Sequence, residues 1–448
     1  MATAASRYQR PLWRWYAATL LMLIYTLSFL DRGVANTLIQ PIKAEFRLSD
    51  TQAGLITGFL FGLANAAAGI FVGPLVDRMN RRNVLGASLL VWSVLTGVCG
   101  GAGSFATLLA ARAAVGAAES GGVPASLSML ASIFPEGKRS TVTGVFFLSS
   151  PFGYLLASAG GGLIAAHFGW RAAFFAASGP GVLLTLLMML TLPEPPRETA
   201  RAEPGGAPLG PGLLSALAYV LRHAVLAPHY LAVVLLALVT GGRSAFMVAF
   251  FMREHGLPIA RAGVLVGMIA CVGGIVGALT GGIVSDRLAR IRASLPQWWL
   301  ALVAGAVGVS DLVLYLHPDL TAALVAAVVS AAVVSMWLGP AYGVVMSIAP
   351  EAMRGRALTL IQIGANIATA LGALAVGMLS DLYGGPHSLR WAMATMACVF
   401  FLVGAFFALA ATRNLGGPVG LDARPAAQAV GPPAVDAAVT ASSAQPGE

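Results

Sequence analysis

Among the charged residues inside long apolar stretches, where an isolated charge is costly, four stand out. Asp31 and Arg32 are adjacent in the first stretch, and Arg112 and Glu119 are seven positions apart in the fourth. On a helix that spacing places Arg112 and Glu119 on one face, about 10 Å apart along the axis. An ionised group near the centre of a bilayer costs about 2.5 to 3.5 kcal/mol on insertion scales, so such residues usually mark a functional site.

These residue types together suit proton transfer. A carboxylate beside an arginine in a site of low dielectric can be ionised in one conformation and protonated in another. We therefore hypothesise that Asp31 and Glu119 carry a proton and that Arg112 sets their affinity for it, with Arg32 in the same group. The alternative is a static ion-pair network that only fixes helix packing.

Arg243 is a separate candidate, for binding the charged group of a substrate. It lies midway along another apolar stretch, and Gly241, Gly242 and Ser244 around it leave space for a ligand to approach. A planar guanidinium binds carboxylate or phosphate through two hydrogen bonds, and Arg112 could act with Arg243 in this way. A structural partner on a neighbouring helix is the alternative.

Four weaker substrate-binding candidates carry neutral polar side chains within apolar stretches. They are Asn65, Tyr154, Gln362 and Asn366. Buried amides more often bond a neighbouring helix than a ligand, so each is a limited indication.

The composition shows which elements must position these residues. Of the 448 residues, 58% are hydrophobic and only 10% are charged, against about 25% charged in soluble domains. Apolar stretches of about twenty residues, long enough to cross a bilayer, recur from Trp15 to Ala411. We predict an all-α polytopic membrane protein with twelve transmembrane helices, over residues 14–37, 50–72, 83–101, 105–134, 139–166, 169–192, 226–252, 260–285, 296–316, 319–346, 354–381 and 389–412.

The basic residues are distributed unevenly between the connecting loops. Of 27 lysines and arginines, eighteen fall on one side of the predicted membrane, six on the other and three within helices. Basic loops stay in the cytoplasm, so both termini are predicted there and the protein in the inner (plasma) membrane. The net charge of +9 thus reflects topology, and we expect no nucleic-acid partner.

The chain repeats itself at a fixed offset. Eight residues recur 209 positions later, among them Gly54 as Gly263 and Asp77 as Asp286. Two six-helix halves of the same orientation follow. The predicted organisation is a cytoplasmic N-terminus (1–13), an N-terminal half (14–192), a cytoplasmic central loop (193–225) with a short surface helix over 213–225, a C-terminal half (226–412) and a disordered cytoplasmic tail (413–448).

Both halves carry a charged loop after their second helix. A carboxylate there could accept hydrogen bonds from the amides at the start of a facing helix and release them when the halves move apart. The predicted cytoplasmic gate comprises Gly73, Asp77, Arg78, Arg81, Arg82, Gly282, Asp286, Arg287, Arg290 and Arg354. The alternative is a plain basic cytoplasmic loop.

This loop resembles the second loop of the major facilitator superfamily, which reads G-x-L-a-D-r-x-g-r-r. Residues 73–82 match it, with Asn80 in place of the usual glycine. Further motifs look like the Spinster-like branch: Phe29-Leu30-Asp31-Arg32, residues 48–55, Arg112-x-x-x-Gly116-x-x-Glu119, Pro151-Phe152-Gly153, Gly169-Trp170-Arg171 and residues 353–357. The related anion:cation symporters share two of these motifs.

The resemblance implies a rocker-switch carrier of amphipathic solutes, with lysophospholipids or sphingoid phosphates as substrates in the animal members. It also implies a central cavity that contains Asp31, Arg112 and Glu119. We expect a proton-coupled monomer in the lipid bilayer, without metal or organic cofactor. The alternatives are a proton symporter for a hydrophilic organic anion, such as a sugar acid or aromatic acid, and a receptor-like protein that transports nothing. A phosphate-binding loop and an enzymatic constellation are not recognisable in the sequence.

Overall fold

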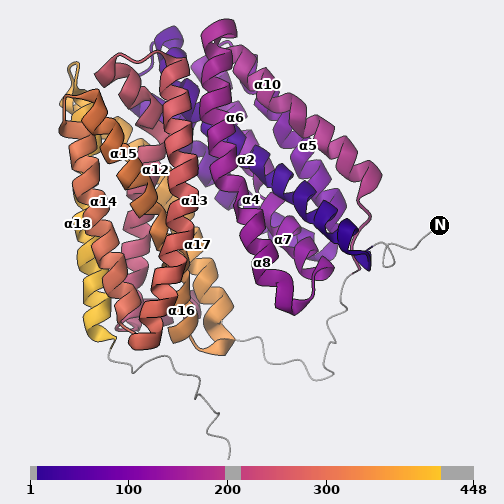
Figure 1. Ribbon diagram of the computed structural model, residues 1–448. Helices are drawn as coiled ribbons and strands as arrows, with labels where there is room; N and C mark the ends of the chain where they lie inside the picture. The colour runs from indigo at the N-terminus through magenta and orange to yellow at the C-terminus, as the bar shows by residue number, and fades with distance from the viewer. Residues whose placement is uncertain (1–7, 197–212, 415–448) are drawn as a thin grey trace, which may run out of the picture.

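The computed structural model describes residues 8–196 and 213–414, apart from the side chains of Pro74, Asp77, Glu136, Ser140, Leu213, Leu338, Glu351 and Ala352. All regular elements in these ranges are helices (Figure 1). The first half contains α2 (Pro11–Phe46), α3 (Asp50–Gly54), the π-helix η1 (Leu55–Phe59), α4 (Leu60–Arg78), α5 (Arg81–Gly100), α6 (Phe105–Glu119), α7 (Gly122–Ile133), α8 (Glu136–Phe147), α9 (Ser149–Leu155), the π-helix η2 (Leu156–Gly160) and α10 (Gly161–Thr191).

The second half follows a short connecting helix. That helix, α11 (Leu213–Arg222), packs on α12 and α17 and lies within the range 213–225 predicted for it. The half itself contains α12 (Leu226–His255), α13 (Ile259–Ile291), α14 (Leu295–Leu316), α15 (Leu320–Val334), the 3₁₀ helix η3 (Ser335–Trp337), α16 (Leu338–Ile348), α17 (Glu351–Tyr383) and α18 (Ser388–Arg413). The predicted tail beyond residue 414 lies outside the described residues.

The described helices form twelve membrane-length spans, as predicted. Ten segments are long and apolar enough to cross a membrane, and one of these, residues 137–191, contains two spans. The break within it is Gly169, whose φ of 81° is a conformation that residues with a side chain rarely adopt. The remaining span consists of α6 and α7, which are separated only by Ser120 and Gly121.

The two halves lie side by side and meet mainly through α13 and α17 (Figure 1). α3, η1 and α4 pack on α17, whereas α9, η2 and α10 pack on α13. Contact between the backbones is very close at Gly377, which faces the Asp50 carbonyl, and at Gly263, which faces the Ser158 carbonyl. A methyl group at either glycine would collide with the opposite half.

The halves are not packed in this way at the end that carries the predicted gate. A Cβ atom at Gly73, Gly144, Gly282 or Gly355 would meet nothing within 4 Å. The hydrogen bonds between the halves, within the described residues, all involve residues 36–51 of the first half. The structure is therefore closed at the Asp50 end, whereas no hydrogen bond between the described residues joins the halves around these glycines.

Candidate transport site

The clearest buried charged pair of the first half joins α2 to α6. Arg32 donates to Oε2 of Glu119 from Nε at 3.0 Å and from Nη2 at 2.8 Å. Ser28, one turn before Arg32, donates its hydroxyl to the same oxygen at 2.8 Å. The Glu119 side chain is fully buried, whereas 32% of the Arg32 side chain remains exposed. A buried carboxylate thus has one partner that is partly exposed.

Aromatic rings surround this pair. The Arg32 guanidinium lies 4.9 Å from the centre of the Phe61 ring and 5.8 Å from that of Phe29. Tyr154, a predicted substrate-binding residue, packs its ring against Phe29 with the centres 5.5 Å apart. The site therefore combines a charged pair with apolar ring faces, which suits a solute that has both an ionic and an apolar part.

Asp31 and Arg112 lie behind Phe61, inside the first half. Both side chains are buried, and Arg112 donates to the backbone carbonyls of Ile56 and Asp31, each at 3.4 Å. Its guanidinium is 4.8 Å from the centre of the Phe61 ring, so Phe61 contacts both arginines. The structure does not join Arg112 and Glu119 directly, because Arg32 occupies that role.

Three buried polar atoms in this region have no hydrogen-bond partner among the described residues. They are Oδ1 of Asp31, Nη2 of Arg112 and Oε1 of Glu119. Buried polar groups are nearly always satisfied, so orphaned atoms require an explanation such as a proton, water or ligand. All three belong to residues that the sequence indicated.

Arg243 is paired within the second half. Its Nη1 lies 3.2 Å from Oδ1 of Asp311 on α14 and 2.5 Å from the hydroxyl of Ser330 on α15. Gly241 and Gly242 face the backbone of α17, so these glycines make room for a helix and not for a ligand, contrary to the interpretation from sequence. Asp311 was not singled out from the sequence, although it is the only acidic residue within α14.

The other polar candidates form two small groups. Asn65 donates to the Gly116 carbonyl at 2.9 Å, which is a bond between α4 and α6 within one half. Gln362 accepts from the hydroxyl of Tyr342 at 2.7 Å and donates to Asn366 at 3.0 Å. Both Gln362 and Asn366 are exposed, so this chain of amides is accessible from solvent or lipid.

The arginines of the first gate motif bind the chain as it leaves α10. Arg81 is buried and donates to Glu194 at 2.9 Å, Ser132 at 2.8 Å and the Pro195 carbonyl at 2.8 Å. The backbone amide of Arg82 also donates to Glu194, at 2.9 Å. The side chain of Asp77 lies outside the described residues. Arg78, Asp286, Arg287 and Arg290 are exposed, and Arg354 is half-buried in the first turn of α17.

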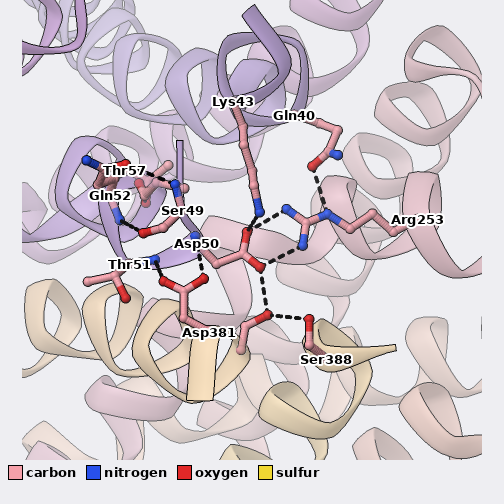
Figure 2. A network of polar contacts seen from close by, with 12 residues as sticks. Gln40, Lys43, Ser49, Asp50, Thr51, Gln52, Thr57, Arg253, Asp381 and Ser388 are labelled. Atoms are coloured by element: carbon pink, nitrogen blue, oxygen red, sulfur yellow. Dashed lines mark hydrogen bonds and ion pairs between the residues drawn. The ribbon is translucent and has the colours of Figure 1, made fainter. Parts of the chain in front are cut away.

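A network that the sequence analysis did not predict closes the opposite end (Figure 2). The Asp50 carboxylate accepts from Lys43 at 2.5 Å and from Ser380 of the other half at 2.7 Å. Arg253, also of the other half, donates to both Asp50 oxygens at 2.8 and 2.6 Å. Gln40 accepts from Nε of Arg253 at 2.8 Å. The network thus ties α2 and the start of α3 to α12 and α17.

A second carboxylate completes this closure (Figure 2). Asp381, at the end of α17, accepts from the backbone amides of Asp50 and Thr51, each at 2.8 Å. The positive end of a helix dipole favours a carboxylate in this position. Ser49 begins the same helix with a capping box to Gln52, so the amides are held in place. The motif of residues 48–55 contains both of these amides and is the signal in the sequence for this contact.

Comparison with known proteins agrees with this architecture. An "MFS-type efflux pump" of Mycolicibacterium smegmatis is 28% identical over 87% of this chain and 91% of its own. The "Probable galactarate/D-glucarate transporter GudP" of Bacillus subtilis is 24% identical over 91% and 92%. "Protein spinster homolog 1" of Rattus norvegicus is 28% identical over 64% of this chain and 57% of its own, so the match spans little more than half of that protein.

Solved structures show the same fold. A bacterial homolog of the human lysosomal transporter Spinster, in an inward-facing and unoccupied conformation, superposes with a TM-score of 0.79 at 26% identity, over 90% of this chain and 98% of that one. The nucleoside transporter NupG (D323A mutant) has a TM-score of 0.72 at 14% identity, over 88% and 99%, which is a likeness of fold alone. The family model that matches residues 21–307 is that of the Major Facilitator Superfamily. This chain is a member of the Major Facilitator Superfamily, a membrane transporter and not an enzyme.

Proposed function

We propose that this transporter couples the movement of protons to that of an amphipathic organic solute, by alternating access. The observation that carries the proposal is the pair of Arg32 and Glu119, a buried carboxylate held by a partly exposed guanidinium. Ionised Glu119 neutralises Arg32. A proton on Glu119 removes that neutralisation and leaves Arg32 available for the anionic group of the solute.

The aromatic surroundings and the relatives favour an amphipathic solute of the lysophospholipid or sphingoid type. Phe29, Phe61 and Tyr154 offer ring faces beside the charge of Arg32. Spinster homologs and an efflux pump are among the relatives. Asp31 and Arg112, buried behind Phe61, would tune the charge of this site.

A hydrophilic organic anion is the second candidate substrate. One relative aligned along nearly its whole length is named as a galactarate/D-glucarate transporter, and another is named as a hexuronate transporter. Arg32 and Arg243 would then bind the two ends of a small acid, and the exposed amides of Gln362 and Asn366 would bind its hydroxyl groups.

Alternating access would require the closed end to open. In the predicted topology both termini and the gate motif lie on the cytoplasmic side of the inner membrane. The Asp50 network would then close the outer side. The protein would act as a monomer, with one site between the halves.

Proton uptake by purified protein in detergent tests the proposal, because binding of an anionic group to Arg32 would lead Glu119 to take up a proton. Lysophospholipids, sphingoid phosphates and small sugar acids are added separately to weakly buffered protein, and the pH change is recorded. Uptake with a lysolipid that is lost in Glu119→Gln supports the proposal, and uptake with only the sugar acids selects the second candidate. Glu45→Gln is the matched control, because Glu45 pairs with Trp170 and Arg171 away from this site. If none of the compounds causes proton uptake, proton coupling is refuted.

A further inference from the structure

The second half contains its own buried carboxylate, in a cluster that involves three helices. Asp311 on α14 is joined to Arg243 on α12 by contacts of 3.2 Å to Oδ1 and 3.5 Å to Oδ2, both from Nη1. Ser330 on α15 donates its hydroxyl to Oδ1 of Asp311 and accepts from Arg243. The Asp311 side chain is 1% exposed, and that of Arg243 is 12% exposed.

Arg243 uses only part of its hydrogen-bonding capacity. A guanidinium carries five donors on three nitrogens, and its strong carboxylate pairs use two nitrogens in parallel. Here Nη1 makes every contact, and Nε and Nη2 have no acceptor among the described residues. The adjacent residue, Ser244, accepts from Asn36 of the other half at 3.3 Å. The spare donors therefore lie on a span that meets the first half.

Very few groups stabilise the ionised form of the Asp311 carboxylate. Among the described residues, the charged or titratable groups that interact with it are Arg243 on α12 and Tyr315, one turn further along α14. α15 contributes the Ser330 hydroxyl, and α18, which packs along α14, contributes apolar side chains such as Phe400. A buried carboxylate with one cation loses most of its stabilisation when that cation binds another anion.

We propose that Asp311 is a second proton-binding site of this transporter, and that its protonation frees Arg243 for an anionic group of the solute. The inference rests on the proposed function, because it adds a second proton ligand to the same transport cycle. A proton adds to a carboxylate oxygen of Asp311, and the ion pair with Arg243 breaks. The solute anion then neutralises Arg243, so the net charge of the cluster is unchanged. Ser330 is a positioning residue that holds the Asp311 carboxyl group.

Infrared difference spectroscopy during a pH titration tests this inference without a known substrate. Purified protein in lipid nanodiscs is acidified stepwise, and the carbonyl band of protonated carboxylic acids is recorded. We expect one component to be lost in Asp311→Asn and to remain in Glu119→Gln. Removal of the cation in Arg243→Gln should move the midpoint of that component upward by about one to three pH units.

Two serines that are close in space provide a matched comparison. Ser330→Ala should shift the frequency of the Asp311 component, because it removes the hydroxyl that bonds the carboxyl group. Ser310→Ala should leave it unchanged, because that hydroxyl donates to Val307 within its own helix. The Ser330→Ala shift also keeps the test valid if Asp311→Asn folds poorly. A double variant, Arg243→Gln with Asp311→Asn, removes both charges and provides the folded reference spectrum.

The outcomes separate the two proposals. Identical titration spectra for the parent protein and Asp311→Asn, with no shift in Ser330→Ala, would show that Asp311 stays ionised and would overturn this inference alone. Loss of a component in Glu119→Gln would leave the proposed function intact in that case. If a component is lost in Asp311→Asn and none is lost in Glu119→Gln, Asp311 is supported as a proton-binding site and Glu119 is ruled out as the proton carrier.

Discussion

Neutralising Asp50 should shift the protein away from the conformation described here. Asn at this position keeps the shape of the side chain but removes the negative charge that Lys43 and Arg253 share. The Asp50 side chain is 4% exposed, so the two cations would be left in a largely buried site. Removing one partner of a buried ion pair costs about 3 to 5 kcal/mol. Taking the lower figure, because Lys43 and Arg253 retain some exposure, the closed end should be weakened by about 3 kcal/mol.

That energy corresponds to a change of roughly one hundredfold in the ratio of closed to open molecules. Spin labels on cysteines introduced at the exposed positions Ala44 and Pro386, after replacement of the native cysteines, report the distance across the closed end. We expect Asp50→Asn to shift the distance distribution toward longer values. Asp319→Asn is the control, because Asp319 caps α15 within one half. An unchanged distribution in Asp50→Asn would refute the role of this network in closure.

Three further predictions concern coupling, stability and closure. Glu119→Gln should abolish uphill transport driven by a pH gradient and retain solute exchange in proteoliposomes, and pH-driven accumulation in the variant would contradict this. Arg81→Ala should lower the free energy of unfolding by about 3 kcal/mol, since it removes the buried guanidinium that pairs with Glu194 and donates to two backbone carbonyls. A thermal melt equal to that of the parent protein would contradict it. Gly377→Ala should lengthen the spin-label distance at the closed end, because Gly377 faces the backbone of the other half. Gly355→Ala should leave that distance unchanged, because a Cβ atom there would meet nothing within 4 Å. Equal distance distributions in the two variants would count against tight closure.

The spans were predictable because a membrane leaves few solutions for the backbone. A run of about twenty apolar residues must form a helix that bonds its own amides, so length and composition determine the element. The repeat then indicated that the spans form two halves of the same orientation. Even the break at Gly169 followed from the sequence, since Gly-Trp-Arg begins the next predicted helix. The structure confirms these features.

The pairing of the charged side chains was less predictable. Spacing along one helix placed Arg112 and Glu119 on a face, but the rotation of α2 decides that Arg32 is the residue that reaches Glu119. Asp311 could have been recognised as a lone acid in an apolar span, but its distance to Arg243 depends on how α12 and α14 pack. Charge within a span therefore identified candidates, and tertiary packing selected the partners.

The closing network was missed for a different reason. Asp50 and Asp381 lie near helix ends, where charged residues in a sequence are usually explained by exposure to water. Their partners across the two halves are more than two hundred positions away, and two of the donors are backbone amides that carry no signature in the sequence. Such contacts become visible only when the two halves are placed together.

The acceptor role of Asp381 has a consequence for natural variation. Its two donors belong to the main chain, so replacement of the side chains at positions 50 and 51 leaves both amides available. Proline is the exception, because it lacks the amide hydrogen. This contact should tolerate side-chain substitutions at positions 50 and 51 of the first half, and it should depend on the carboxylate of Asp381 in the second half. Related chains could therefore drift at position 51 and keep the contact, whereas loss of the carboxylate at 381 would need a replacement elsewhere at the same helix end.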